Sequence, residues 1–167
     1  MKARLTTQLT LLFAAVLSLM ATGSASAIER QEATNWCWAA CIQDVAADEG
    51  MRLDQDDIVT RLYGGVVDQP ASTHHVVQLL QSYNMGANLA TRPPVNAQEL
   101  YGSLQQGYRF IALIYPQGGA VGHFVVISDF FQDGSLIVED PMDGRTHRMS
   151  PQQVFSYNWI QTIVVHP

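Results

Sequence analysis

The pattern of hydrophobic and polar residues changes its period near Pro93 and Pro94. Before them, apolar residues recur three and four positions apart, and glycine or asparagine follows each run, as in amphipathic helices. This pattern predicts helices over residues 35–49, 54–63 and 73–83. The residues of the first helix expected to face inward are Trp38, Ala39, Cys41, Ile42 and Val45 or Ala46. A further helix is predicted from Asn96, which precedes Glu99 by three positions in a variant of the capping box, to Gly107.

The rest of the chain carries short apolar runs rich in β-branched residues, which are typical of strands. The predicted strands cover residues 109–115, 123–128, 135–140, 146–149 and 159–165. Asp133-Gly134 forms a hairpin turn, and Ser150 with Pro151 opens a short helix that ends near Tyr157. Helices that precede an antiparallel sheet predict an α+β fold.

The N-terminal residues 1–27 predict a secretory signal peptide. A lysine and an arginine lie in the first four residues, an apolar run covers residues 9–20, and Ala-Ser-Ala at residues 25–27 is a small-x-small cleavage pattern. An uncleaved anchor is the alternative, although the apolar run is short for a membrane span. We therefore expect residues 28–167 to form one exported domain, periplasmic or secreted, with no stable membrane anchor.

The charge of the chain narrows the classes of partner. The formal net charge is −6, and the only lysine, Lys2, lies in the predicted signal peptide. An acidic, lysine-poor surface argues against nucleic acid and anionic membranes as partners.

Two cysteines, Cys37 and Cys41, lie four positions apart and hence on one face of the first predicted helix. A disulfide between them would strain that helix, so we expect none. Cys41 is predicted to be a small buried hydrophobe, and a resolving thiol for oxidised Cys37 is the alternative.

Cys37 stands at the start of a predicted helix, in the sequence Asn35-Trp-Cys37-Trp-Ala-Ala. With Asn35 as the expected cap, the thiol lies in the first helical turn, where the helix dipole and free backbone N–H groups favour a thiolate. Gln31 can reach back over this helix start with a side-chain N–H. Downstream, His123 begins one predicted strand and Asp140 ends the next. A cysteine, a histidine and a carboxylate, with a glutamine ahead, are the parts of an acyl-transfer site.

These motifs resemble the papain-like cysteine peptidase superfamily. The spacing of Gln31 and Cys37-Trp38 matches its oxyanion glutamine, nucleophile and following tryptophan. Gly122-His123-Phe-Val-Val-Ile and Val138-Glu-Asp140-Pro look like its histidine and aspartate motifs in the compact bacterial branch. That branch includes effector cysteine proteases of plant pathogens and peptidases that cut double-glycine leaders. The resemblance covers about residues 30–159.

The resemblance implies a papain-like fold, with N-terminal helices packed on a C-terminal antiparallel sheet, and a peptide or protein substrate. Cys37 would be the nucleophile, His123 the proton shuttle and Asp140 the residue that orients it, while Gln31 and the Cys37 backbone N–H would form the oxyanion hole. It implies no metal and no organic cofactor. Unlike the leader peptidases, this chain carries no transporter. Because Gln31 closely follows the predicted cleavage point, no propeptide is expected. The peptidase activity would then be restrained by substrate choice or by an inhibitor or immunity partner, or it would not be restrained at all.

Plainer interpretations of these residues stay open. Cys37 could be a buried structural cysteine, Gln31 a surface glutamine and Asp140 an ordinary turn residue. The rival carboxylates are Glu139, expected on the opposite strand face, and Asp129, expected at the far strand end. His74 and His75 are alternative candidates for the catalytic base, and together with His147 they could form a metal site, although their spacing matches no recognised ligand motif. Trp38 is expected in the core or in the cleft wall. Gly118, Gly119 and Gly122 are expected to line the cleft or to form a flexible loop.

The function predicted from the sequence is an exported thiol hydrolase that cleaves peptide or amide bonds. The alternatives are a peptidoglycan peptide or amide hydrolase, a transglutaminase-like acyl transferase and a non-catalytic peptide-binding module.

Overall fold

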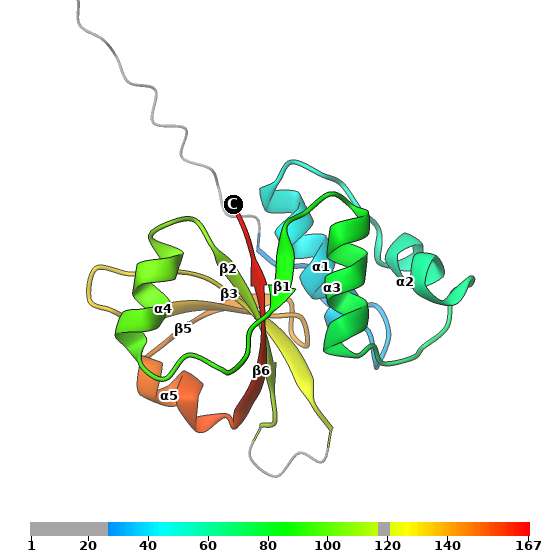
Figure 1. Cartoon of the computed structure of the whole chain (residues 1–167). Coiled ribbons are helices and arrows are strands. Elements are labelled where there is room, and N and C mark those ends of the chain that lie inside the picture. The colour runs from blue at the N-terminus through cyan, green and yellow to red at the C-terminus, as the bar shows by residue number, and fades with distance from the viewer. Residues whose placement is uncertain (1–26, 117–120) are drawn as a thin grey trace, which may run out of the picture.

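A computed structural model describes residues 27–116 and 121–167 (Figure 1). The predicted signal peptide, all but its last residue, and Gly118 and Gly119 lie outside these ranges. The helices are α1 (Cys37–Asp48), α2 (Gln55–Tyr63), α3 (Thr73–Ser82), α4 (Ala97–Leu104) and α5 (Pro151–Ser156). The strands are β1 (Ala87–Leu89), β2 (Arg109–Ile114), β3 (His123–Phe130), β4 (Leu136–Asp140), β5 (Arg145–Met149) and β6 (Trp159–Val165). None of the helices in these ranges is long and apolar enough to cross a membrane.

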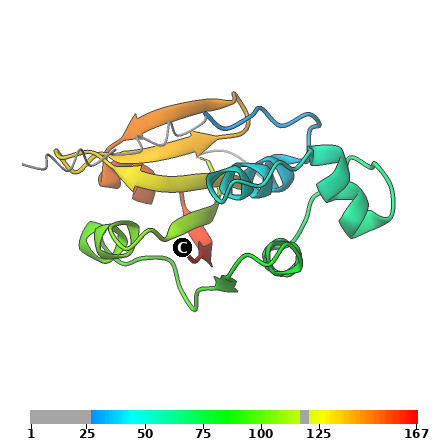
Figure 2. The ribbon, with the colours of Figure 1, turned by 90° about the horizontal axis from the view of Figure 1, so that it is seen from above.

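The strands form one six-stranded antiparallel sheet in the order β1-β6-β2-β3-β4-β5. Helices α1, α2 and α3 lie together on one side of the sheet, and α4 and α5 lie on the other (Figure 1). Figure 2 shows the same arrangement from above, with α2 farthest from the strands. This architecture confirms the predicted α+β fold with N-terminal helices on an antiparallel sheet.

The side chains of β3 point alternately to the two faces of the sheet, and the core is accordingly divided into two clusters. Phe124 and Val126 belong to the cluster that packs against α1, whereas Val125 and Ile127 belong to the cluster under α4 and α5. Successive side chains of a strand point to opposite faces, so one apolar run serves both layers. The inward residues predicted for the first helix are all buried, with Trp38 fully enclosed.

The start of α1 differs from the prediction. The residue before the helix is Trp36, which makes no side-chain capping bond, so the predicted cap at Asn35 is wrong. Asn35 instead binds a distant residue: its backbone N–H donates to Asp68 Oδ1 at 2.7 Å and its Nδ2 donates to the Asp68 carbonyl at 3.3 Å. Asn35 therefore binds Asp68, 33 positions away, and does not cap the helix. The helix begins at Cys37.

Most other ends of the helices and strands agree with those predicted from the hydrophobic pattern. Ser150 forms a complete capping box with Gln153, and Asn96 accepts from the Glu99 backbone N–H. Strand β1 was not predicted, because its three residues are too few to show a period; it is held by pairing with β6.

Candidate active site

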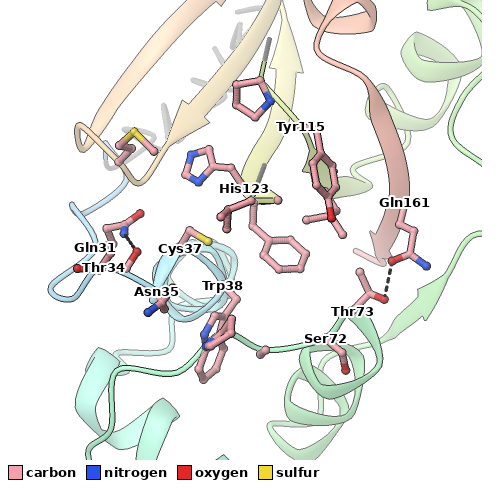
Figure 3. A pocket seen from close by; sticks show the side chains of 18 of the residues that line it. Gln31, Thr34, Asn35, Cys37, Trp38, Ser72, Thr73, Tyr115, His123 and Gln161 are labelled. Carbon is pink, nitrogen blue, oxygen red and sulfur yellow. Dashed lines mark hydrogen bonds between the residues drawn. The ribbon is translucent and has the colours of Figure 1, made fainter. Parts of the chain in front are cut away.

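Cys37 is the first residue of α1 and lines a cleft of about 990 Å³. The first intrahelical bonds run from the Ala39 and Ala40 N–H groups to the Trp36 carbonyl, so the Cys37 N–H belongs to the donors that a helix start leaves free. Because α1 packs on β3, its N-terminus meets the strand that begins with His123. Figure 3 shows the side chains of Cys37 and His123 turned toward one another.

His123 is buried and lies between Asp140 and Cys37. Its Nε2 lies 2.7 Å from Asp140 Oδ1, which leaves Nδ1 for the Cys37 thiol. Burial acts to lower the pKa of His123, but hydrogen bonds to Asp140 and Cys37 outweigh it and raise the pKa to about 9. The imidazole therefore carries its proton at neutral pH and faces Cys37 as a cation.

Asp140 ends β4, beside the start of β3. Its Oδ1 accepts from His123 and from the Met142 backbone N–H at 2.8 Å. Although burial acts to raise the pKa of Asp140, these two hydrogen bonds and the His123 charge lower it below its ordinary value. Asp140 is thus an ionised carboxylate fixed by its own turn, and it can hold the orientation of the imidazole ring.

The rival carboxylates lie elsewhere. Glu139 points to the opposite face of the sheet, where its Oε1 accepts from Ser128 Oγ at 2.6 Å. Asp129 pairs with Ile137 near the far end of β3. Both positions agree with the strand geometry expected from the sequence.

Gln31 lines the same cleft, but its side chain is already engaged. Its Nε2 donates to the carbonyls of Ala33 at 2.9 Å and Thr34 at 2.8 Å, and its Oε1 is buried without a hydrogen-bond partner among the described residues. Its backbone N–H donates to the Pro141 carbonyl at 2.8 Å, which ties the glutamine to the residue after Asp140. The amide is therefore close to Cys37, with both of its hydrogens directed at its own loop.

Two tryptophans beside the cysteine hold one wall of the cleft. Trp36 Nε1 donates to the Val67 carbonyl at 2.9 Å, and Trp38 Nε1 donates to the Gln69 carbonyl at 3.1 Å. These bonds fix the loop that leads to the cleft residues 70–74. Trp38 therefore belongs to the core and also forms part of the cleft wall, the two positions expected for it.

The opposite wall depends on a glycine. A Cβ on Gly122 would lie 2.9 Å from Leu113 Cδ1 and 3.3 Å from the Tyr115 ring, so these side chains can cover this backbone only because residue 122 is glycine. At the far end of the cleft, Thr73 Oγ1 donates to Gln161 Oε1 at 3.0 Å (Figure 3). Sequence reasoning did not find Leu113, Tyr115 or Gln161, because a cleft wall carries no local sequence signal.

The described lining of the cleft contains no carboxylate, ammonium or guanidinium group. Its residues are Gln31, Thr34, Asn35, Cys37, Trp38, Pro70, Ala71, Ser72, Thr73, His74, Leu113, Tyr115, Pro116, Val121, Gly122, His123, Phe124, Met142 and Gln161.

The alternative histidines and the second cysteine have other settings. His74 and His75 are exposed, and His74 borders the cleft. Cys41 is fully buried and unpaired, and burial, followed by the nearby Cys37, raises its pKa well above the ordinary value. It is the buried hydrophobe that the sequence predicted.

One group of potential metal ligands lies beside the site. Within residues 27–116 and 121–167, one set of three such residues, Asp140, Asp143 and His147, has its ligand atoms all within 4.8 Å of one another. Asp143 and His147 already pair at 3.0 Å. The predicted set of His74, His75 and His147 is not brought together.

Comparisons with known proteins identify the family and the fold of the chain. The family model described as "Peptidase_C39 like family" matches residues 25–164. The peptidase domain of Streptococcus ComA, described as a bi-functional ABC transporter involved in a quorum sensing pathway, superposes with a TM-score of 0.67 at 20% identity, covering 83% of this chain and 96% of that chain. The peptidase domain of Streptococcus mutans ComA gives 0.59 at 17% identity, covering 85% and 100%. At these identities the structures show a shared fold. No curated protein matches the chain.

Proposed function

Because the chain belongs to the Peptidase C39 like family and is a papain-like cysteine peptidase, we propose that it is an exported thiol hydrolase that cleaves peptide or amide bonds through Cys37, His123 and Asp140. The observation that carries the proposal is the buried His123, bonded at 2.7 Å to Asp140 and turned toward Cys37 on the wall of the same cleft. A nucleophile, a base and a group that orients the base are the minimum for acyl transfer by a thiol.

In the proposed mechanism, the Cys37 thiolate attacks the substrate carbonyl while the protonated His123 stays hydrogen-bonded to Asp140. His123 then gives its proton to the leaving amine, and an acyl-enzyme forms. Water attacks this thioester with His123 as base, which releases the acid and the Cys37 thiolate and leaves His123 protonated again. Asp140 remains ionised throughout and holds the ring in place.

The oxyanion would be held by the Cys37 backbone N–H and by Gln31 Nε2. The first donor is free because it lies at the start of α1. The second must exchange its bond to the Thr34 or Ala33 carbonyl for one to the oxyanion. Such an exchange would let the hole form fully only when substrate charge develops.

The described cleft lining has no carboxylate, ammonium or guanidinium group, which supports a preference for neutral side chains in the substrate. A charged side chain would lose its hydration there, and the one charge assigned to the lining, on His123, already has Asp140 as its partner. Apolar side chains would instead contact Leu113, Tyr115 and Trp38. We therefore propose peptide substrates with uncharged residues on the acyl side of the cut.

The proposal of export rests on the basic, apolar and small-residue pattern of residues 1–27. Cleavage there would release the domain 28–167 to the periplasm or the exterior. Restraint of the exported peptidase activity would come from substrate choice or from an inhibitor or immunity partner.

The test exposes residues 28–167 to a peptide library varied in side-chain charge and reads the products by mass spectrometry. We expect cleavage after neutral residues, abolished in Cys37→Ala. Products from purified peptidoglycan alone would identify a wall hydrolase, and incorporation of a labelled amine would identify a transferase. If no product forms and iodoacetamide labels Cys37 no faster than an ordinary thiol, the proposed hydrolase is wrong.

A further inference from the structure

A pair of buried acids lies beneath the catalytic residues. Asp44 on α1 is 8% exposed and Glu139 on β4 is 3% exposed. Glu139 pairs with Val126, whose side chain belongs to the core cluster that packs against α1, so both acids lie where the helix packs on the sheet. Ser128 Oγ donates to Glu139 Oε1 at 2.6 Å. Asp44 Oδ2 is buried with no hydrogen-bond donor facing it among the described residues. Two acidic side chains in contact inside a core require a specific explanation.

A shared proton accounts for the unpartnered oxygen. Two carboxylates in contact out of water cannot both stay ionised, because desolvation and mutual repulsion oppose the second charge. Burial, followed by the hydrogen bond to Glu139, raises the pKa of Asp44 far above its ordinary value. A protonated carboxyl is a donor as well as an acceptor, so the Asp44 O–H can donate to Glu139 and leave neither oxygen unsatisfied.

The neighbouring groups do not neutralise the pair. Asp48, one turn further along α1, adds negative charge, and Arg109 on β2 adds positive charge. Arg109 Nε is already bound to Asp48 Oδ2 at 3.2 Å, so much of its charge is compensated. The remaining titratable neighbour on the helix is Cys41, which is itself fully buried.

The position of the pair links it to the catalytic residues. Cys37, Cys41 and Asp44 follow one another at spacings of four and three along α1, so they lie on one helix face. Glu139 directly precedes Asp140 in β4. The contact therefore joins the helix that begins with the nucleophile to the strand that ends with the residue orienting His123.

We propose that Asp44 keeps a proton that it shares with Glu139 in a hydrogen bond, and that both acids are positioning residues that hold α1 against β4, keeping Cys37 opposite His123 and Asp140. The positioning role rests on the proposed function of those three residues, whereas the shared proton does not. Neither acid contacts substrate.

The shared proton is tested by the pH dependence of unfolding between pH 5 and 8. A folded protein that keeps a proton which the unfolded chain has lost becomes less stable as pH rises. We expect wild type to release one more proton on unfolding than Asp44→Asn, whose amide donates to Glu139 without titrating. Glu49→Gln is the matched control, since it removes an exposed carboxylate directly after the same helix, and it should keep the wild-type proton release. Equal proton release in wild type and Asp44→Asn would overturn the pair.

The positioning role is tested by the rate at which iodoacetamide labels Cys37 at pH 6.5, with the site mapped by mass spectrometry. Asp44→Ser, whose side chain is too short to reach Glu139, should slow labelling and kcat by about tenfold or more with little change in KM, because a small displacement of the thiol weakens its pairing with His123. Asp44→Asn should restore both rates.

The outcomes separate the two claims. A folded Asp44→Ser variant with wild-type rates would overturn the positioning role. If Asp44→Ser does not fold, Glu139→Gln takes its place: it keeps a hydrogen bond to Asp44 but loses the titrating pair, so it should retain the labelling rate and lose the extra proton. Slow labelling in wild type would contradict the proposed function and the positioning role together, and the proton count would still decide whether the acids share a proton.

Discussion

His123 Nε2 and Asp140 Oδ1 lie 2.7 Å apart at the adjoining ends of β3 and β4. The two residues come from neighbouring antiparallel strands, so their distance is fixed by backbone pairing on the sheet. This bond contributes to the raised pKa of His123, about 9, and thereby to the charge that faces Cys37.

Asp140→Asn should lower kcat/KM about 10²–10⁴-fold, the range typical of acid–base catalysis, because the imidazole loses its orientation and its charge partner. The pKa of His123 should fall, so the alkaline limb of the kcat/KM profile should move below pH 9. Profiles measured from pH 5 to 10 check both effects. Asp143→Asn, which removes the exposed carboxylate paired with His147, is the control and should leave the limb in place. An unchanged limb in Asp140→Asn would show that the carboxylate does not support the His123 charge.

The His123 charge should also appear in the pH dependence of stability. Its pKa is raised from 6.5 to about 9, so its stabilising contribution is complete below about pH 6.5 and is lost as pH rises through about 9. Denaturant midpoints measured at pH 6, 7.5 and 9 should fall more steeply for wild type than for His123→Gln. Parallel curves would mean that the folded protein does not hold this proton.

The positions of Cys37, His123 and Asp140 could be located from the sequence because each has a local signal. A cysteine ahead of an apolar helical run, a histidine that opens a strand and an aspartate that closes the next strand can all be located from hydrophobic period and turn residues. Antiparallel pairing of adjacent strands then brings the histidine and the aspartate together without further information.

Features that depend on distant contacts were not predictable in this way. Asn35 looked like a helix cap, but its partner Asp68 lies 33 positions away. Asp44 is an acidic residue within a helix, and only the packing of α1 on the sheet shows that it is buried against Glu139. The direction of the Gln31 amide depends on the carbonyls of its own loop, which the sequence does not orient.

Gln31→Ala should lower kcat about 10²–10³-fold, equivalent to about 2.7–4 kcal/mol for one oxyanion donor, with a smaller change in KM. The reason is that the amide would act only when charge develops on the substrate oxygen. Steady-state kinetics on one neutral peptide measure the two constants separately. Gln132→Ala, an exposed glutamine in the hairpin turn, is the control and should behave as wild type. A loss confined to KM would instead make Gln31 a ground-state binding residue.

Gly122→Ala should damage the cleft more than it damages the fold. The added Cβ would meet Leu113 Cδ1 at 2.9 Å and the Tyr115 ring at 3.3 Å, so both side chains must move into the space that the substrate needs. Overpacking of this kind costs about 1–3 kcal/mol, and we expect KM to rise while labelling of Cys37 by the small reagent iodoacetamide stays near the wild-type rate. Leu113→Ala in the same chain should relieve the closest contact and recover part of the lost affinity. Gly65→Ala, where no atom lies within 4 Å of the new Cβ, provides the matched control. If Gly122→Ala binds peptide as wild type does, the wall formed by Leu113 and Tyr115 is not part of the substrate site.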